Sequence, residues 1–165
     1  MIGWWNTTAE DLDEILDLSY EIWPRHSEGT DLLSRFHLAP EGCWTLKDDI
    51  DVVGYCLTQP SYYHNPPKLS QAYIPSNDHD CYHLHDIAIL PDYQGMGYAR
   101  VAVGMFLNDL ERNMPKTLIC VDDTYDFWFE MGFQEHPDKQ IQAMVANDYG
   151  IGSFYMHYIR GDKNV

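Results

Sequence analysis

Residues 81–100 read CYHLHDIAILPDYQGMGYAR and form the most informative segment of the sequence. Its first half, Cys81 to Leu90, is mostly apolar and predicts a strand that is buried on both faces. Pro91 to Gly97 then forms a turn with two glycines, and a helix with one apolar face is expected from Tyr98 to about Met114. A buried strand, a glycine-bearing turn and a helix in this order indicate an α/β unit.

The flanking segments extend this unit into one domain over residues 1–165. On the N-terminal side we expect, in order, a strand, two helices and a hairpin: Ile2–Trp5, Thr8 to Pro24, Asp31–Leu38 and Cys43 to Thr58. Residues 59–80 carry four prolines and form the long irregular segment. On the C-terminal side we expect a strand, a short helix and two closing strands: Thr117–Val121, DFWFEM up to Gly132, Phe133–Glu135 and Ser153–Arg160. This pattern predicts a mixed α/β sheet with helices on both faces.

The amino-acid composition limits the classes of molecule that the protein is expected to bind. The chain has 26 Asp and Glu against 10 Lys and Arg, for a net charge of −16, which disfavours nucleic acid and anionic membranes. Cationic partners such as amines would be concentrated near such a surface. The alternative is that the acidic charge only keeps the protein soluble. No apolar run approaches the ~18 residues of a membrane span, and the first residues do not resemble a signal peptide. Four cysteines without a C-x-x-C pair indicate buried thiols and a cytoplasmic location.

The turn from Gln94 to Arg100 is a candidate anion site. Small residues at Gly95, Gly97 and Ala99 let backbone N–H groups approach an anion, and the start of the helix adds its positive end. We expect a pyrophosphate there, assisted by Arg100. Neither a Walker A loop nor a Rossmann fingerprint is present, and a simple tight turn would show the same residues.

The order of these motifs resembles the GNAT superfamily of acetyl-CoA-dependent N-acetyltransferases. Residues 94–99, QGMGYA, are similar to its Q/R-x-x-G-x-G/A loop, and residues 127–133, FWFEMGF, look like its FYEKLGF segment. The resemblance implies a sheet of about seven strands that splays between the fourth and fifth, flanked by about four helices. It further implies an acetyl-CoA site without a metal. Its pantetheine arm would be lined by Ile87, Ala88 and Ile89, and its pyrophosphate held by Gln94, Gly95, Met96, Gly97, Tyr98, Ala99 and Arg100.

His83 and His85 are candidate bases. An amine with a pKa near ~10 must lose a proton before it attacks a thioester, and an imidazole can accept one near neutral pH. Alternate residues of a strand share a face, so both rings could reach one cavity. The pair is similar to the histidine pair of serotonin (arylalkylamine) N-acetyltransferases. Two alternatives remain open. The histidines could be structural, with ordinary hydrogen-bond partners in the core or on the surface, or they could bind a metal ion together with Cys81. Three ligands at alternate positions of one strand would be crowded around a tetrahedral ion.

The general acid departs from the family pattern. Trp128 stands where the family often has a tyrosine, and an indole N–H cannot deliver a proton usefully. Tyr125 lies one helical turn earlier and could replace it, or it could simply pack. Val121 also stands where many relatives place an asparagine near the coenzyme.

The expected function is acetyl transfer to a primary amine of a small molecule, an arylalkylamine or a polyamine, by direct attack in a ternary complex. One alternative in the same fold is acetylation of a protein lysine or N-terminus. An alternative of another class is a non-catalytic acyl-CoA-binding module. The chain is expected to be a monomer or a homodimer.

Overall fold

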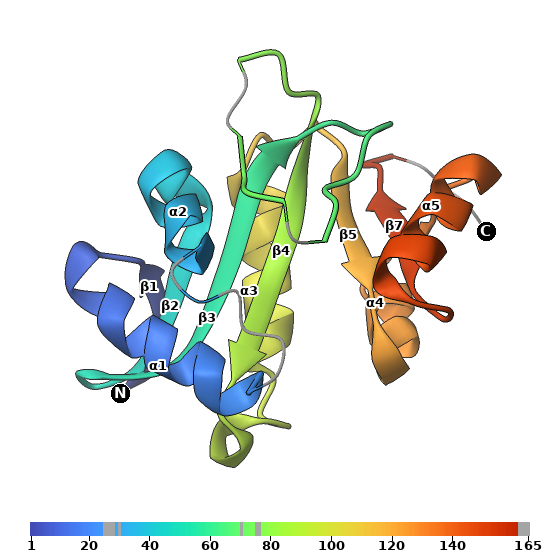
Figure 1. Ribbon diagram of the computed structural model, residues 1–165. Helices are drawn as coiled ribbons and strands as arrows, with labels where there is room; N and C mark the ends of the chain where they lie inside the picture. Colours follow the sequence, from blue (N-terminus) through green and yellow to red (C-terminus); the bar gives the residue numbers. More distant parts are fainter. Residues whose placement is uncertain (25–28, 30, 70, 75–76, 162–165) are drawn as a thin grey trace.

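The computed structural model describes every residue except 25–28, 30, 70, 75–76 and 162–165. The described strands form one seven-stranded sheet in the order β1-β2-β3-β4-β5-β7-β6 (Figure 1). Their bounds are β1 Ile2–Asn6, β2 Cys43–Asp48, β3 Asp51–Ser61, β4 Cys81–Ile89, β5 Lys116–Cys120, β6 Gln134–Glu135 and β7 Phe154–Tyr158. The β4–β5 pair is parallel and the other pairs are antiparallel, which confirms the predicted mixed sheet.

Helices cover both faces of this sheet. Their bounds are α1 Leu12–Ile22, α2 Asp31–Leu38, α3 Tyr98–Asp109, α4 Tyr125–Glu130 and α5 Lys139–Tyr149. The helices α1 and α2 pack on one face over β3, and α5 packs on the same face over β7. The helices α3 and α4 pack on the opposite face, and α3 is seen behind β4 in Figure 1.

Each face has its own apolar core. The α3 and α4 side is the larger, where Phe106 and Trp128 pack against Leu84 and Leu118 of the central strands. On the other side, Ile15 and other residues of α1 and α2 pack against β3 and β4. Each fully buried large side chain contributes roughly 1.5–3 kcal/mol, so the sheet is held from both sides.

The sheet opens between β4 and β5. Only three residue pairs join these strands: Tyr82 with Lys116, His83 with Thr117 and Leu84 with Leu118. Beyond Leu84, β4 remains paired with β3 alone. The predicted splay between the fourth and fifth strands is therefore confirmed.

Several element boundaries differ from the sequence prediction. The helix α3 ends at Asp109 rather than near Met114, because Leu110 has an extended backbone and Glu111 has a φ of 35°. The strand β3 continues to Ser61, so the irregular segment begins at Tyr62. All four cysteines are buried and free, as predicted.

The helix α5 is absent from the sequence prediction. Asp138 caps it and accepts hydrogen bonds from the backbone N–H groups of Gln140 and Ile141, at 2.9 and 3.2 Å. Only Ile141 and Val145 are buried, so its apolar stripe is too narrow for the helical period to stand out. The sequence signals that could have indicated this helix were the N-cap residue Asp138 and Gly150 after the last turn.

A glycine on β3 sets how closely this strand packs against β4. A Cβ at Gly54 would lie 2.9 Å from the carbonyl oxygen of Ala88. We expect Gly54→Ala to lower the free energy of unfolding by about 1–3 kcal/mol, since the neighbour is backbone and cannot yield cheaply. Urea unfolding followed by circular dichroism measures the change.

The matched control is Gly104→Ala on α3, where a Cβ would meet nothing within 4 Å. That variant is expected to gain up to about 1 kcal/mol from helix propensity. A similar change in both variants would show that the contact between Gly54 and Ala88 does not limit the packing.

Candidate functional site

The turn between β4 and α3 is built on two glycines. Gly95 and Gly97 have φ values of 74° and 88°, a region that other residues rarely adopt, and Gly97 is the N-cap of α3. The side-chain amide of Gln94 donates to the carbonyl of Ile89 at 2.8 Å, which fixes the turn to the end of the strand. These three sequence-predicted residues therefore have clear structural reasons for their identities.

The same turn faces open space. A Cβ added to Gly95 or Gly97 would meet nothing within 4 Å, so a ligand can approach the backbone closely there. The first turn of α3, which begins with Tyr98, Ala99 and Arg100, supplies N–H groups that have no acceptor within a helix, and the helix dipole favours an anion. This donor set fits the pyrophosphate of acetyl-CoA. Met96 is exposed at the tip of the turn.

Arg100 points toward α4. Its guanidinium donates to the carboxylate of Glu130 at 2.8 Å and lies 5.6 Å from the centre of the Phe127 ring. Both charged groups are more than half exposed, and such surface pairs contribute little, about 0–1 kcal/mol. Arg100 can therefore exchange Glu130 for an anion at small cost.

Ile87, Ala88 and Ile89 lie where the two central strands separate. Each pairs with β3, opposite Cys56, Tyr55 and Gly54 respectively. None pairs with β5, so the β4 edge beyond Leu84 is open toward it in the described ladder. Backbone N–H groups on such an edge can bind an extended ligand or a developing oxyanion.

A β-bulge places His85 in β4. Asp86 pairs with Leu57 and Leu84 pairs with Thr58, so His85 is the extra residue of β4. Leu84 and Ile87 consequently both pack on the α3 side although they are three residues apart. His83, His85 and Asp86 are thus brought together on the face that α1 and α2 cover.

The two histidines differ in environment. His83 is 2% exposed and its Nδ1 lies 2.9 Å from the hydroxyl oxygen of Thr117. Burial, reinforced by repulsion from His85 and Arg35, lowers the pKa of His83 to about 3, so its ring is neutral at physiological pH. His85 is only half-buried. Of the two rings, His85 is the more accessible to a substrate.

Tyr125 lies away from the histidines. Its hydroxyl donates to the carboxylate of Glu135 at 3.1 Å, and burial followed by this bond raises its pKa. Its ring packs edge-on against Phe154 on the α3 and α4 side of the sheet. Trp128 is buried there in edge contact with Phe133. The structure therefore does not bring Tyr125 or Trp128 together with His83 and His85.

A buried polar row that the sequence did not reveal crosses the sheet through His83. The register aligns five strands in this row: Gln59, His83, Thr117, His157 and Gln134. Gln59 and Thr117 are 2% and 0% exposed. No local pattern announces such a row, because each member depends on pairing between distant segments.

A cavity adjoins this row. It has a volume of about 320 Å³ and is lined by Arg35, Gln59 and much of the segment from Pro60 to His79. Gln59 faces His83 directly across the β3–β4 ladder, which puts the cavity beside the histidine-bearing face. The cavity is the candidate acceptor site.

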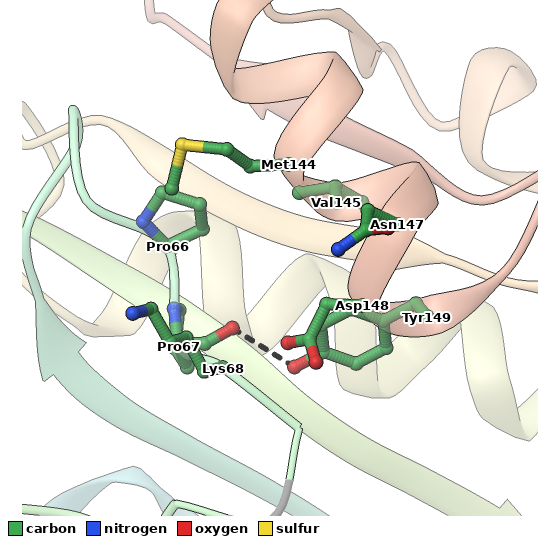
Figure 2. Close-up of a pocket in the computed structure, with 8 residues that line it drawn as sticks. All are labelled: Pro66, Pro67, Lys68, Met144, Val145, Asn147, Asp148 and Tyr149. Atoms are coloured by element: carbon green, nitrogen blue, oxygen red, sulfur yellow. Dashed lines mark hydrogen bonds between the residues drawn. The ribbon is translucent and has the colours of Figure 1, made fainter.

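A second cavity of about 320 Å³ lies between α5 and the same irregular segment (Figure 2). Pro66, Pro67 and Lys68 line both cavities and so form a wall between them. Two hydrogen bonds join this wall and the residue after it to α5. The hydroxyl of Tyr149 donates to the carbonyl of Pro67 at 2.9 Å, which is dashed in Figure 2, and the N–H of Leu69 donates to the carboxylate of Asp148 at 2.7 Å.

The described residues contain no group of three His, Cys, Asp or Glu side chains that could hold a metal ion, and Cys81 with the two histidines does not form one. None of the described helices is both long and apolar enough to span a bilayer.

Comparisons with known proteins agree with this architecture. Among solved structures, the loading GNATL domain of CurA from Lyngbya majuscula superposes with a TM-score of 0.76 at 12% identity, covering 96% of this chain and 98% of that one. Ard1 from Thermoplasma volcanium gives 0.70 at 14% identity, with 96% and 97% covered. Arabidopsis thaliana Naa50, in complex with the bisubstrate analogue CoA-Ac-MVNAL, gives 0.66 at 12%, with 94% and 97% covered. These likenesses show the fold.

The family itself is shown by sequence. A search of curated proteins finds no match. The model of the acetyltransferase (GNAT) family matches residues 9–133, well over half of the chain and all of its strand, turn and helix at 81–109. The chain therefore belongs to the GNAT family of acetyl-CoA-dependent acetyltransferases.

Proposed function

We propose that this enzyme transfers the acetyl group of acetyl-CoA to the primary amine of a small molecule by direct attack within a ternary complex. The observation that carries the proposal is the bulge that puts His85 on the same face of β4 as His83, next to the unpaired part of the β4 edge. Neither ring lines the cavity; Gln59, which pairs with His83 across the ladder, does. Acetyl-CoA supplies the acetyl group as an activated thioester. The protein's residues have to bind the thioester, deprotonate the amine and stabilise the oxyanion.

His85 is the proposed base. The amine nitrogen loses a proton to its imidazole and forms the C–N bond as the C–S bond breaks. His83 is neutral and buried behind it, so it contributes a fixed polar group rather than a store for the proton. A backbone N–H on the unpaired β4 edge, near Ile89, is the proposed donor to the carbonyl oxygen.

The proposed mechanism does not require a general acid at position 128. A thiol near pKa ~8.5 is a tolerable leaving group as the thiolate and regains a proton from solvent. Tyr125 is the alternative donor, but its hydroxyl is engaged by Glu135. The buried Trp128 is assigned to packing.

The cavity favours a small acceptor. Its volume of about 320 Å³ lies at the lower end of small-molecule sites, which span roughly 300–1,000 Å³. Tyr62 and Tyr73 belong to its lining, and aromatic rings attract an ammonium group. These features support an arylalkylamine or a polyamine. The second candidate, acetylation of a protein N-terminus or lysine, is favoured by the peptide-bearing analogue in the Arabidopsis structure.

Thiol release from acetyl-CoA tests the function. The panel comprises arylalkylamines, polyamines and short peptides with free N-termini or lysines. Saturable release with a small amine supports the proposal, whereas release with peptides alone would make the acceptor a protein. If none of the acceptors in the panel gives thiol release, the proposed function is contradicted.

The base assignment predicts a loss of turnover. We expect the double variant His83→Gln, His85→Gln to lower kcat at neutral pH by about 10²-fold or more, since no imidazole remains to take the amine proton. His37→Gln, an exposed histidine on α2, is the matched control. Because the pKa of His83 is about 3, the single variant His83→Gln should leave any rate inflection between pH 5 and 8 in place. Unchanged turnover in the double variant would remove the base assignment and leave the fold intact.

The cofactor cradle predicts a specific binding defect. Gly97→Ala forces a side chain onto a φ of 88° at the start of α3 and fills space that a pyrophosphate would use. We expect KM for acetyl-CoA to rise at least about tenfold, which corresponds to ~1.4 kcal/mol. The matched control is Gly150→Ala, with a φ of 106° at the end of α5 and open space around it. Equal effects in the two variants, with equal losses of stability, would point to strain alone.

The wall of the cavity predicts an acceptor-specific defect. Asp148→Ala combined with Tyr149→Phe removes both hydrogen bonds that join the Pro66–Lys68 wall and the residue after it to α5. We expect KM for the amine to rise while KM for acetyl-CoA stays unchanged, because the cofactor cradle lies at the other end of β4. Initial rates over a grid of both substrate concentrations separate the two constants. A rise in KM for acetyl-CoA alone would refute the assignment of the cavity.

A further inference from the structure

The cavity proposed for the acceptor has a lining whose charge is opposite in sign to that of the protein. Over the whole chain, Asp and Glu outnumber Lys and Arg by 26 to 10. The described residues that line this cavity nevertheless include two permanent cations, Arg35 and Lys68, and no aspartate or glutamate. A cation repels an ammonium group, so recognition of an amine alone does not account for this lining.

Arg35 is the buried one of the two cations. It is 3% exposed, whereas Lys68 is exposed to solvent. The Arg35 Nη1 donates to the backbone carbonyl of Asp31 at 3.1 Å, which holds the guanidinium against its own helix. An arginine keeps its charge at every physiological pH, and its planar group matches the two oxygens of a carboxylate. A buried guanidinium in the lining therefore suits a ligand with an anionic group.

Two other groups of the lining have an unmet hydrogen bond. Within the part of the chain that the structure describes, the side-chain oxygen of Gln59 and the hydroxyl oxygen of Tyr73 are buried without a hydrogen-bond partner. The Gln59 residue as a whole is 2% exposed. Burial of a polar group without a partner costs free energy, so both groups favour a ligand that supplies the missing bonds.

The chemistry of these groups defines what the ligand has to offer. An amide oxygen only accepts, so the partner of Gln59 is an N–H or O–H group, such as that of an amine. Gln59 pairs with His83 across the β3–β4 ladder, so this contact belongs to the histidine-bearing face. The guanidinium of Arg35 only donates, and its natural partner is an anion. Burial, followed by the charge of Glu41, raises the pKa of Tyr73 to about 12, so its hydroxyl is also a donor at neutral pH.

The anion that fits best carries a single charge. One buried cation compensates one negative charge, whereas a phosphate monoester carries about 1.5–2. The net charge of −16 opposes any excess of negative charge in the cavity. An acid also stands next to the lining, since the carboxylate of Asp78 accepts a hydrogen bond from the hydroxyl of Tyr62. A carboxylate is therefore favoured over a phosphate.

We propose that the acceptor is an amine of the amino-acid class, which carries a carboxylate on the same molecule. Arg35 binds the carboxylate, Tyr73 donates to it, and the side-chain oxygen of Gln59 accepts from the amine. This inference rests on the proposed function and narrows it from primary amines in general to zwitterionic ones. A polyamine suits the lining less well, because its second ammonium group would meet Arg35 or Lys68 where a carboxylate is favoured.

Pairs of an amino acid and the amine that lacks its carboxylate test the substrate class. The pairs are alanine with ethylamine, phenylalanine with phenethylamine, and lysine with 1,5-diaminopentane. In the thiol-release assay we expect the best acceptor to be an amino acid, with a kcat/KM at least about tenfold above that of its amine. An equal or higher kcat/KM for the amine in every pair would overturn the inference and leave the proposed function standing. A higher kcat/KM for O-phosphoethanolamine than for any amino acid would overturn the choice of a carboxylate.

Arg35→Met tests the assigned residue. This variant removes the charge and keeps a long side chain, so we expect the ratio of kcat/KM for the amino acid to that for its amine to fall at least about tenfold. Arg35→Lys keeps the charge without the planar group and should retain part of the preference. The matched control is Arg112→Met, the same change at an exposed arginine that does not line the cavity. An unchanged ratio in Arg35→Met, or an equal fall in Arg112→Met, would refute the role of Arg35.

Binding to the wild-type protein tests the anion site without acetyl transfer and without variants that have to fold. We expect 3-phenylpropionate, which has the carboxylate and no amine, to bind at least about tenfold more tightly in calorimetry than the neutral 3-phenylpropanamide. Equal or weaker binding of the acid would overturn the inference. Absence of acetyl transfer to any acceptor would instead defeat the proposed function, and the calorimetry would still report on the anion site.

Discussion

The site depends on the early end of the pairing between β4 and β5. Three residue pairs join these strands, and after Leu84 the β4 backbone has β3 as its only ladder partner. Separation of two parallel central strands normally costs hydrogen bonds, and here packing on both faces compensates. The bulge at His85, the open edge and the glycine turn follow one another along β4 and the residues after it. One interruption of the sheet therefore organises both the proposed cofactor site and the proposed base.

The two faces of the sheet divide the work. The α3 and α4 face is almost wholly apolar and anchors α3, whose first turn is the proposed anion site. The opposite face carries the polar row from Gln59 to Gln134, with His83 in it, and the cavity proposed for the acceptor. His83 and Thr117 are hydrogen-bonded to each other on that face, whereas the side-chain oxygen of Gln59 is buried without a hydrogen-bond partner among the described residues. The net charge of −16 is a property of the whole chain, and its negative field attracts cations such as protonated amines.

Local signals predicted the centre of the fold and missed features that depend on distant pairing. The apolar run of β4 and the family motif at 94–99 were sufficient for the mixed sheet and its splay, and the two glycines of the turn do have positive φ values. The anion site at this turn stays a prediction. The bulge at His85 leaves no trace in composition, since one extra residue changes only the register. Thr117 and His157 look like ordinary strand residues until the pairing of β5 with β7 places them side by side. The helix α5 was hidden by its narrow apolar stripe, and Tyr125 proved to belong to the opposite face from the histidines.

The Pro66–Lys68 wall, shared by two cavities and joined with the residue after it to α5 by two hydrogen bonds, also bears on how such an enzyme can diversify. The wall belongs to an irregular segment, and its anchors are two side chains at the end of α5, a helix that contributes no residue to the proposed cofactor site or base. Substitutions at those anchors would reshape the room for the amine while every reacting group kept its place. Related enzymes with this scaffold could therefore evolve a new acceptor specificity while the catalytic residues stay the same.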